Sequence, residues 1–258
     1  MIQSLQSSEI DVGIGLTEGW VAGLANAQPP SSAGYKLVGT YVETPLCWAI
    51  STGAKRSDIN NVEDLKNKKI GVSRVGSGSY VMGFVLADQQ GWQGEGEGGK
   101  GPFKVVPLGT FDKLRAAVNG GEADFFMWEH FTSKRYFDSG EIRRVGEIYT
   151  PWSSWKIVAR DVLDKRMQPM SDAINGGIRY FRENEEEAVK YISTELDYSE
   201  EDAREWIKTV RFPDDVRGVD PRVIDKTIEI LGKASVLDAS KVSSDDMVAI
   251  KRESRADT

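Results

Sequence analysis

Short apolar runs alternate with amphipathic stretches along the first part of the chain. Apolar and β-branched runs of about four to eight residues are typical of strands, whereas apolar residues three and four positions apart are typical of helices. The predicted strands cover residues 10–14, 35–42, 45–50, 69–73, 103–107, 123–128, 144–149 and 156–159. The predicted helices between them cover residues 2–8, 80–90, 111–119 and 132–137. This alternation indicates an α/β fold built from parallel βαβ units.

The chain becomes almost wholly helical after Asp161. Long amphipathic runs, which we expect to cap one lobe of the fold, cover residues 167–193, 199–209 and 221–234. Residues 91–102 are rich in Gly and Glu and predict a flexible surface loop, and the charged residues 251–258 are expected to fray.

The chain opens on what reads as the end of a helix, followed by the strand at residues 10–14 and a turn at Thr17, Glu18 and Gly19. A domain that opens on the last turns of a helix leaves its first strand without a partner. We therefore expect that a first strand and helix are missing from this chain.

A weak internal repeat relates the start of the chain to its middle. Setting Ile10 against Ala123, a shift of 113 positions, aligns Asp11 with Asp124, and an apolar strand with a polar end follows each. Helix ends favour Gly, Ser, Glu and Asp, so chance could also produce this pattern. The repeat predicts one copy of the same unit in each lobe.

The length and charge of the chain exclude some classes of binding partner. The 258 residues suffice for two lobes with separate cores, and the formal charge of -7 argues against nucleic acid or an anionic membrane as partner. No window is long and apolar enough to insert into a membrane, and the start lacks the basic and apolar regions of a secretory signal. The sequence therefore predicts a cytoplasmic protein, with a transporter partner only if the protein is exported.

Cys47 and His130 are the sole cysteine and the sole histidine. No intrachain disulfide can form, and we expect neither a Cys/His metal cluster nor any cofactor. Cys47 lies in an apolar strand and is expected to be packing; His130 without a nucleophile or a metal set is more often structural than catalytic. No nucleotide-binding or nucleophile-elbow motif is present.

Two segments carry a resemblance to a known family. Residues 3–15 end in Glu-Ile-Asp-Val-Gly-Ile-Gly, and residues 62–73 read Val-Glu-Asp-Leu-Lys-Asn-Lys-Lys-Ile-Gly-Val-Ser before a Gly-Ser-Gly-Ser loop. They resemble type II periplasmic binding proteins, in particular the branch that binds alkylsulfonates, nitrate or thiamine-pyrimidine precursors and its intracellular fungal relatives. The resemblance covers nearly the whole chain.

The resemblance implies a two-lobed periplasmic-binding-protein-like II fold with two crossings, near residues 50–53 and 150–154. Lobe one would comprise residues 1–50 and 153–258, and lobe two residues 51–152. Such a protein closes two lobes on a small molecule, here an anionic or zwitterionic ligand, with a heterocycle as one candidate. The implied ligand-binding residues are Thr17, Glu18, Glu43, Ser73, Gly76, Ser77, Gly78, Ser79, Tyr80, Thr110, Phe111, Trp128, Glu129 and Trp152.

The residue types of this set suit such a ligand. The loop from Gly76 to Ser79 opens a helix, where free N–H groups favour an anion, although a plain cap is the alternative. Trp128 and Trp152 offer flat rings, and Glu18, Glu43 and Glu129 could accept an amine or ring N–H, although core packing and solvated charges are the alternatives.

Two other functions stay open. An enzyme of the thiamine-pyrimidine synthase type shares this fold, but it needs a cysteine-rich motif and a placed histidine that Cys47 and His130 do not provide. A ligand-sensing effector domain of a transcription regulator would need a helix-turn-helix, which is not visible in this chain.

Overall fold

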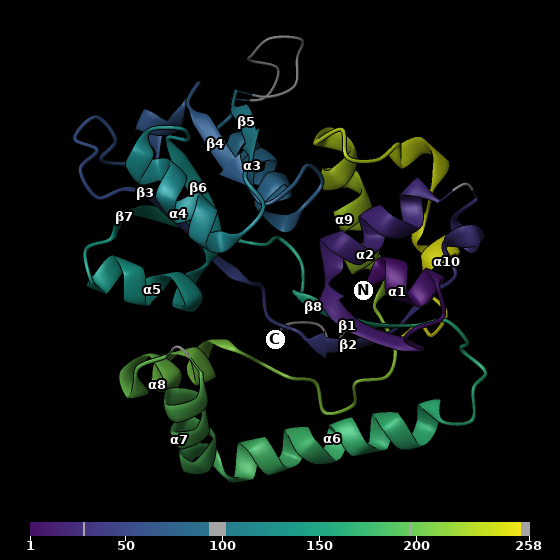
Figure 1. The fold of residues 1–258 in the computed structure, drawn as a ribbon. Helices are drawn as coiled ribbons and strands as arrows, with labels where there is room; N and C mark the ends of the chain where they lie inside the picture. The colour runs from purple at the N-terminus through teal and green to yellow at the C-terminus, as the bar shows by residue number, and fades with distance from the viewer. Residues whose placement is uncertain (28, 93–101, 197, 254–258) are drawn as a thin grey trace. The chain divides into compact units, whose positions relative to one another are not determined.

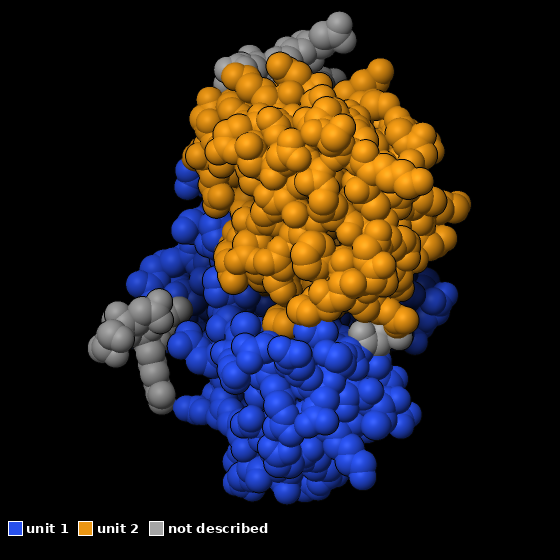
Figure 2. All heavy atoms as spheres, turned by 90° about the vertical axis from the view of Figure 1, so that its left-hand side faces the viewer, with its two compact units in different colours: residues 1–45, 151–232, 237–258 blue, residues 46–150, 233–236 orange. Residues whose placement is uncertain are grey.

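The computed structural model describes residues 1–27, 29–92, 102–196 and 198–253. Most of the predicted loop at 91–102 and of the predicted frayed end at 251–258 lies outside the described residues. The chain divides into two compact units (Figure 2). Unit 1 comprises residues 1–45, 151–232 and 237–258, and unit 2 comprises residues 46–150 and 233–236.

Unit 1 is built on a three-stranded sheet in the order β1-β8-β2. The strands are β1 (Val12–Leu16), β2 (Lys36–Val42) and β8 (Trp155–Ala159), and β8 runs antiparallel to both neighbours. The Thr17 N–H donates to the Ser154 carbonyl, and the Ser154 N–H donates to the Thr44 carbonyl. These bonds fix the start of β8 beside the ends of β1 and β2, so the prediction of parallel pairing is wrong for this sheet.

Helices pack around this sheet (Figure 1). Apolar residues of β2 and β8 form a core with Ile178 and Val216. The predicted run at 167–193 is interrupted at Asn184, whose backbone leaves the helical region with φ -127° and ψ 49°. The helical elements of unit 1 are α1 (Ile2–Gln6), α2 (Thr17–Asn26), η1 (Pro30–Ala33), α6 (Met167–Glu183), α7 (Glu185–Glu195), α8 (Glu200–Thr209), α9 (Pro221–Lys233), η4 (Ala239–Lys241) and α10 (Ser244–Met247).

Helix α2 replaces the predicted turn at Thr17, Glu18 and Gly19. Trp20, Val21, Leu24 and Ala25 are all buried, and their spacing of three and four positions is that of a helix face. The polar start of the segment hid this periodicity, and the turn prediction is therefore wrong.

Unit 2 holds a five-stranded sheet in the order β5-β4-β6-β3-β7. Strand β4 pairs in parallel with β5 and β6, whereas β3 pairs antiparallel with β6 and β7. Its elements are β3 (Cys47–Gly53), η2 (Glu63–Leu65), β4 (Lys69–Val72), α3 (Gly78–Gln89), β5 (Lys104–Pro107), α4 (Phe111–Gly120), β6 (Phe125–Glu129), α5 (His130–Asp138) and β7 (Ile142–Tyr149).

Helices α3 and α4 cover opposite faces of this sheet. On β4, the Ile70 side chain packs against Gly83 of α3, whereas the next residue, Gly71, faces Leu114 of α4. Successive residues of a strand point to opposite faces, so the two helices lie on either side. Buried Leu114, Val118 and Phe126 belong to the core on the α4 side. The α/β class predicted from the sequence is confirmed.

The chain passes between the two units at two places that lie near the predicted crossings, and the short segment 233–236 also belongs to unit 2. The first boundary lies between Pro45 and Leu46, ahead of residues 50–53, because β3 pairs with β6 and β7 along its whole length. The second lies between Thr150 and Pro151, inside the predicted range. Across the part of the chain that the structure describes, none of the helices has the length and hydropathy that a membrane crossing requires.

Candidate ligand-binding site

The junction between β1 and α2 is held by contacts with the segment that leads into β8. The Thr17 hydroxyl donates to the carbonyls of Ser153, at 2.6 Å, and Ser154, at 3.1 Å. On the other side of the junction, a Cβ added to Gly15 would lie only 2.9 Å from Cζ2 of Trp20. A glycine is needed there so that the indole can pack on the strand, and together these contacts fix the first turn of α2.

Glu18 lies in that first turn and is buried, with 1% of its surface exposed. The Trp152 Nε1–H donates to Glu18 Oε2 at 3.1 Å, whereas Oε1 has no hydrogen-bond partner among the described residues. Burial raises the pKa of Glu18 to about 7, against the opposing effects of its own backbone N–H, Trp152 and Lys156. The carboxyl group therefore titrates near neutral pH and keeps one acceptor unused.

Lys156 brings a buried amine to the same region. It belongs to the central strand β8, is 1% exposed, and donates from Nζ to the Ser153 hydroxyl at 2.6 Å and the Ser153 carbonyl at 3.0 Å. Burial lowers the pKa of Lys156 to about 7; Arg252 lowers it further, and Glu18, Glu43 and Asp220 oppose the shift. Sequence reasoning missed this residue, although a lysine inside the apolar strand Trp155–Ala159 was a readable signal.

Glu43 follows the end of β2 and is already paired with two guanidinium groups. Its Oε1 accepts from Arg252 at 2.7 Å, and its Oε2 lies 3.3 Å from Arg211 Nε. Arg252 is held in place because its N–H donates to the Val219 carbonyl, and its own Nε is buried without a partner among the described residues. Of the predicted site residues, unit 1 thus brings together Thr17, Glu18 and Trp152, with Glu43 acting on Lys156 through charge.

The predicted Gly/Ser loop in unit 2 is a helix cap with its hydroxyl groups engaged. Ser77 is the N-cap of α3: its hydroxyl accepts from the Tyr80 N–H, donates to the Arg74 carbonyl, and lies 3.0 Å from that of Ser79. The Ser79 hydroxyl also accepts from the Ser73 N–H at 3.1 Å. Gly76, with φ 77°, takes the left-handed conformation that glycine tolerates, and Gly78 opens α3. Their part in ligand binding stays a prediction.

The remaining predicted residues of unit 2 are engaged in capping or stacking. Glu129 caps α5 by accepting from the N–H groups of Phe131, at 3.0 Å, and Thr132, at 2.6 Å. The Trp128 ring stacks on Phe111 with centroids 5.0 Å apart. Thr110 precedes α4, and its hydrogen bond lowers the pKa of Asp112. These contacts favour structural roles, and ligand contact by these residues stays a prediction.

Unit 1 also contains a cavity of about 220 Å³ lined by residues of β2, β8 and α6. Its lining includes Val38, Ile157 and Met170 but neither Glu18 nor Lys156. None of the buried polar atoms without partners in the described residues belongs to this lining. We therefore place the candidate site at Glu18 and Lys156.

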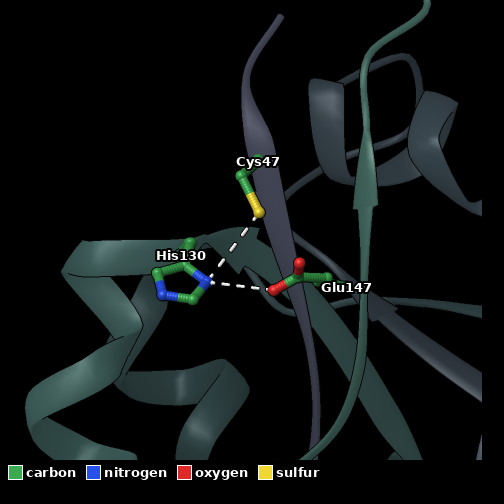
Figure 3. A group of neighbouring side chains, drawn as sticks. All are labelled: Cys47, His130 and Glu147. Atoms are coloured by element: carbon green, nitrogen blue, oxygen red, sulfur yellow. Dashed lines mark hydrogen bonds and ion pairs between the residues drawn. The ribbon is translucent and has the colours of Figure 1, made fainter. Parts of the chain in front are cut away.

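Composition did not predict a group of three polar side chains that lie together in unit 2. Cys47, His130 and Glu147 point toward one another from β3, α5 and β7 (Figure 3). The Cys47 Sγ lies 3.8 Å, and Glu147 Oε2 3.6 Å, from His130 Nδ1. Counting one cysteine and one histidine overlooked a carboxylate supplied by the neighbouring strand.

Cys47 is partly exposed, so the expectation that it is a buried packing residue is wrong. Burial of its thiol nevertheless dominates the raised pKa of about 11, and the pKa of His130 is lowered by burial and by Arg144. A thiol whose pKa is raised in this way is a weak nucleophile.

Comparison with known proteins decides the family. The family described as Ca3427-like PBP matches residues 48–148. The solved structure of the Candida albicans CA3427 gene product, described as defining a family with the generic periplasmic binding protein fold, is 40% identical to this chain. The match covers 99% of this chain and 85% of that chain, with a TM-score of 0.84. This chain belongs to the CA3427 family.

More distant structures share the fold of the CA3427 family. The alkanesulfonate-binding protein SsuA of Xanthomonas axonopodis pv. citri, bound to MOPS, is 16% identical over 95% of this chain and 83% of that chain, with a TM-score of 0.72. The aliphatic sulphonate binding protein SsuA of Escherichia coli is also 16% identical, over 100% of this chain and 81% of that chain, with a TM-score of 0.69. No curated protein sequence gives a significant match. The resemblance and the fold class predicted from the sequence are confirmed.

Proposed function

We propose that this protein binds a small zwitterionic molecule. In this proposal, Glu18 accepts a hydrogen bond from the amine or ring N–H group of the ligand, or forms an ion pair with it. The observation that carries the proposal is Glu18 Oε1, a buried carboxylate oxygen without a partner among the described residues. A buried polar atom left unpaired costs about 1–3 kcal/mol or more when charged, and a ligand donor would remove that cost.

The positive groups of unit 1 supply the other half of a zwitterion site. Lys156 is buried, and Arg252, which is ion-paired with Glu43, helps to lower its pKa to about 7; when protonated, Lys156 gives this region a second cationic side chain near the underused carboxyl group of Glu18. An anionic ligand group would relieve the repulsion between them. The family fold and the sulfonate-binding proteins that share it support a solute-binding role of this kind.

Other parts of the sequence-based hypothesis stay predictions. Closure of two lobes on the ligand, a heterocyclic ligand body, a cytoplasmic location, and a transporter partner of an exported form have no test in the described residues. The synthase and regulator alternatives likewise have no specific contact in their favour among those residues.

Native mass spectrometry beside denaturing mass spectrometry tests this function. A bound ligand adds mass only under native conditions, and the released compound can then be identified. The shift in melting temperature is then measured with aminoalkanesulfonates and with alkanesulfonates that lack the amine. This comparison tests whether Glu18 binds an N–H group of the ligand. We expect the amine-bearing compounds to stabilise the protein more, and Glu18→Gln to remove that difference.

Glu9→Gln serves as the matched control, because it neutralises an exposed carboxylate of the same unit. If both variants respond to the two compound classes as the unaltered protein does, Glu18 is not the amine-reading group and the proposal fails.

A further inference from the structure

We propose that Cys47, His130 and Glu147 form a zinc site in unit 2, with Sγ, Nδ1 and one carboxylate oxygen as ligands. The three ligand atoms lie within 4.8 Å of one another and come from side chains that face a common point (Figure 3). Thiolate, imidazole and carboxylate are the side-chain ligands that zinc takes in proteins.

The sheet order brings these residues together. Strand β3 lies between β6 and β7, and Cys47 pairs with Tyr149 of β7. Glu147, two positions from Tyr149, is the diagonal neighbour of Cys47 on the same face of the sheet. On the other side, Trp48 pairs with Glu129, so His130 follows directly at the start of α5. Three adjacent elements therefore supply one ligand each.

The spacing fits tetrahedral zinc before any ion is added. Zinc–sulfur and zinc–nitrogen bonds of about 2.3 and about 2.05 Å, at a tetrahedral angle, place sulfur and nitrogen about 3.6 Å apart. The same geometry places nitrogen and carboxylate oxygen about 3.4 Å apart. The corresponding separations are 3.8 Å and 3.6 Å, so these two pairs need to close by only a few tenths of an ångström, and the sulfur and the carboxylate oxygen lie within 4.8 Å of each other.

A cationic side chain already contacts two of the three ligand residues. Arg144 approaches His130 Nδ1 to 2.8 Å with one nitrogen and donates to Glu147 Oε2 at 3.0 Å with the other. The pairing of β3 with β7 shifts register between Ile50 and Ser51, which are opposite Gly146 and Arg144, so one extra residue is accommodated on β7. This bulge turns Arg144 to the side of Glu147 although the two are three positions apart.

Arg144 can give way to an ion. Its side chain is 31% exposed, and the Glu147 side chain is 39% exposed, so the guanidinium group can swing into solvent. Zinc would replace the positive charge that Arg144 now supplies and would bind the Cys47 sulfur as a thiolate, with the thiol proton released to solvent. Three protein ligands leave a fourth position for water or another small ligand.

A zinc titration tests the site. The tag-free protein is first stripped of metal, and it then competes with a chromogenic chelator for added zinc. We expect one zinc per chain, and a loss of affinity of at least tenfold in each of Cys47→Ser, His130→Ala and Glu147→Gln. Cobalt should give a thiolate-to-metal charge-transfer band that Cys47→Ser abolishes. Arg144→Ala should bind zinc more tightly, because it removes the competing cation.

Circular dichroism of each variant separates ligand loss from misfolding, and Arg144→Ala keeps all three ligands should one ligand variant fail to fold. Glu18→Gln should bind zinc as the unaltered protein does, so this result is independent of the proposed solute site. The proposal is overturned if the unaltered protein and Arg144→Ala both fail to bind one zinc, or if Cys47→Ser binds it with unchanged affinity and cobalt spectrum.

Discussion

Two strand-to-helix junctions, one in each unit, carry a glutamate at the start of the helix. Strands β1 (Val12–Leu16) and β6 (Phe125–Glu129) are related by the same shift of 113 positions that aligns Asp11 with Asp124, and each leads directly into a helix. The element bounds follow the shift on which the predicted internal repeat rests. The two glutamates differ, however, because Glu129 has a full set of partners and Glu18 does not.

Position within the helix explains the difference. Glu129 is the N-cap, where a side chain can reach back to the unpaired N–H groups of the first turn. Glu18 is the second residue of α2 and is directed to Trp152 in a buried setting. A satisfied carboxylate at a helix start favours a structural role, whereas the unused oxygen of a buried carboxylate supports the proposal that Glu18 contacts a ligand.

The largest expected effect is on the pH dependence of stability. Burial raises the pKa of Glu18 from 4.5 to about 7 in the folded protein. The contribution of this carboxyl group to the free energy of unfolding is therefore fully present below pH 4.5 and is lost as the pH rises from 4.5 through 7. Glu18→Gln should therefore be more stable than the parent at pH 8 by on the order of 3 kcal/mol, and equal to it near pH 4. Urea unfolding at several pH values measures this, and a difference that does not change with pH would refute it.

The second largest expected effect is a difference in ligand affinity between variants of Glu18 and Glu129. Glu18→Gln should weaken binding of an amine-bearing ligand by about 100-fold, which corresponds to about 2.7 kcal/mol, because a charge-assisted hydrogen bond is lost. Glu129→Ala should leave the affinity within about twofold. Isothermal titration with the compound released from the purified protein checks both, and equal losses in the two variants would break the comparison.

The packing of the first junction offers a third test. Gly15→Ala places a methyl group against Trp20 and should lower the free energy of unfolding by about 2 kcal/mol. Gly19→Ala is the matched control, because nothing lies within 4 Å of its added Cβ and alanine favours the helix. Chemical denaturation should rank Gly19→Ala at or above the parent; a Gly15→Ala variant as stable as the parent would show that the indole can move.

The smallest effect concerns the cap itself. Glu129→Ala should lower the free energy of unfolding by about 1 kcal/mol, because two backbone N–H groups of α5 lose their acceptor. Glu122→Ala, at an exposed position of the same unit, should change it by less than about 0.5 kcal/mol. Equal stability of the two variants would contradict the capping role.

The local pattern of apolar residues predicted most of the strands of both units, because a short apolar run is typical of a buried strand whichever strands it pairs with. It failed at α2, where a polar start hid an apolar face, and it could not reveal that β8 enters its sheet antiparallel. Direction within a sheet depends on contacts such as Thr17 to Ser154, which are distant in sequence.

The candidate site was predictable only in part. Glu18 and Trp152 were named from the family resemblance, whereas Lys156 was passed over as a strand residue and Glu147 was never linked to Cys47 and His130. Pairing across β3 and β7 creates that last group, and pairing partners cannot be deduced from a single strand.

The sheet order of unit 1 also has a consequence for folding during translation. Strands β1 and β2 do not pair with each other, since β8 separates them, so this sheet cannot form until residue 159 has been synthesised. All strands of unit 2 lie between Cys47 and Tyr149 and are complete earlier. The strands of unit 2 can therefore pair during translation, whereas β1 and β2 have no central strand until residues 155–159 have been synthesised.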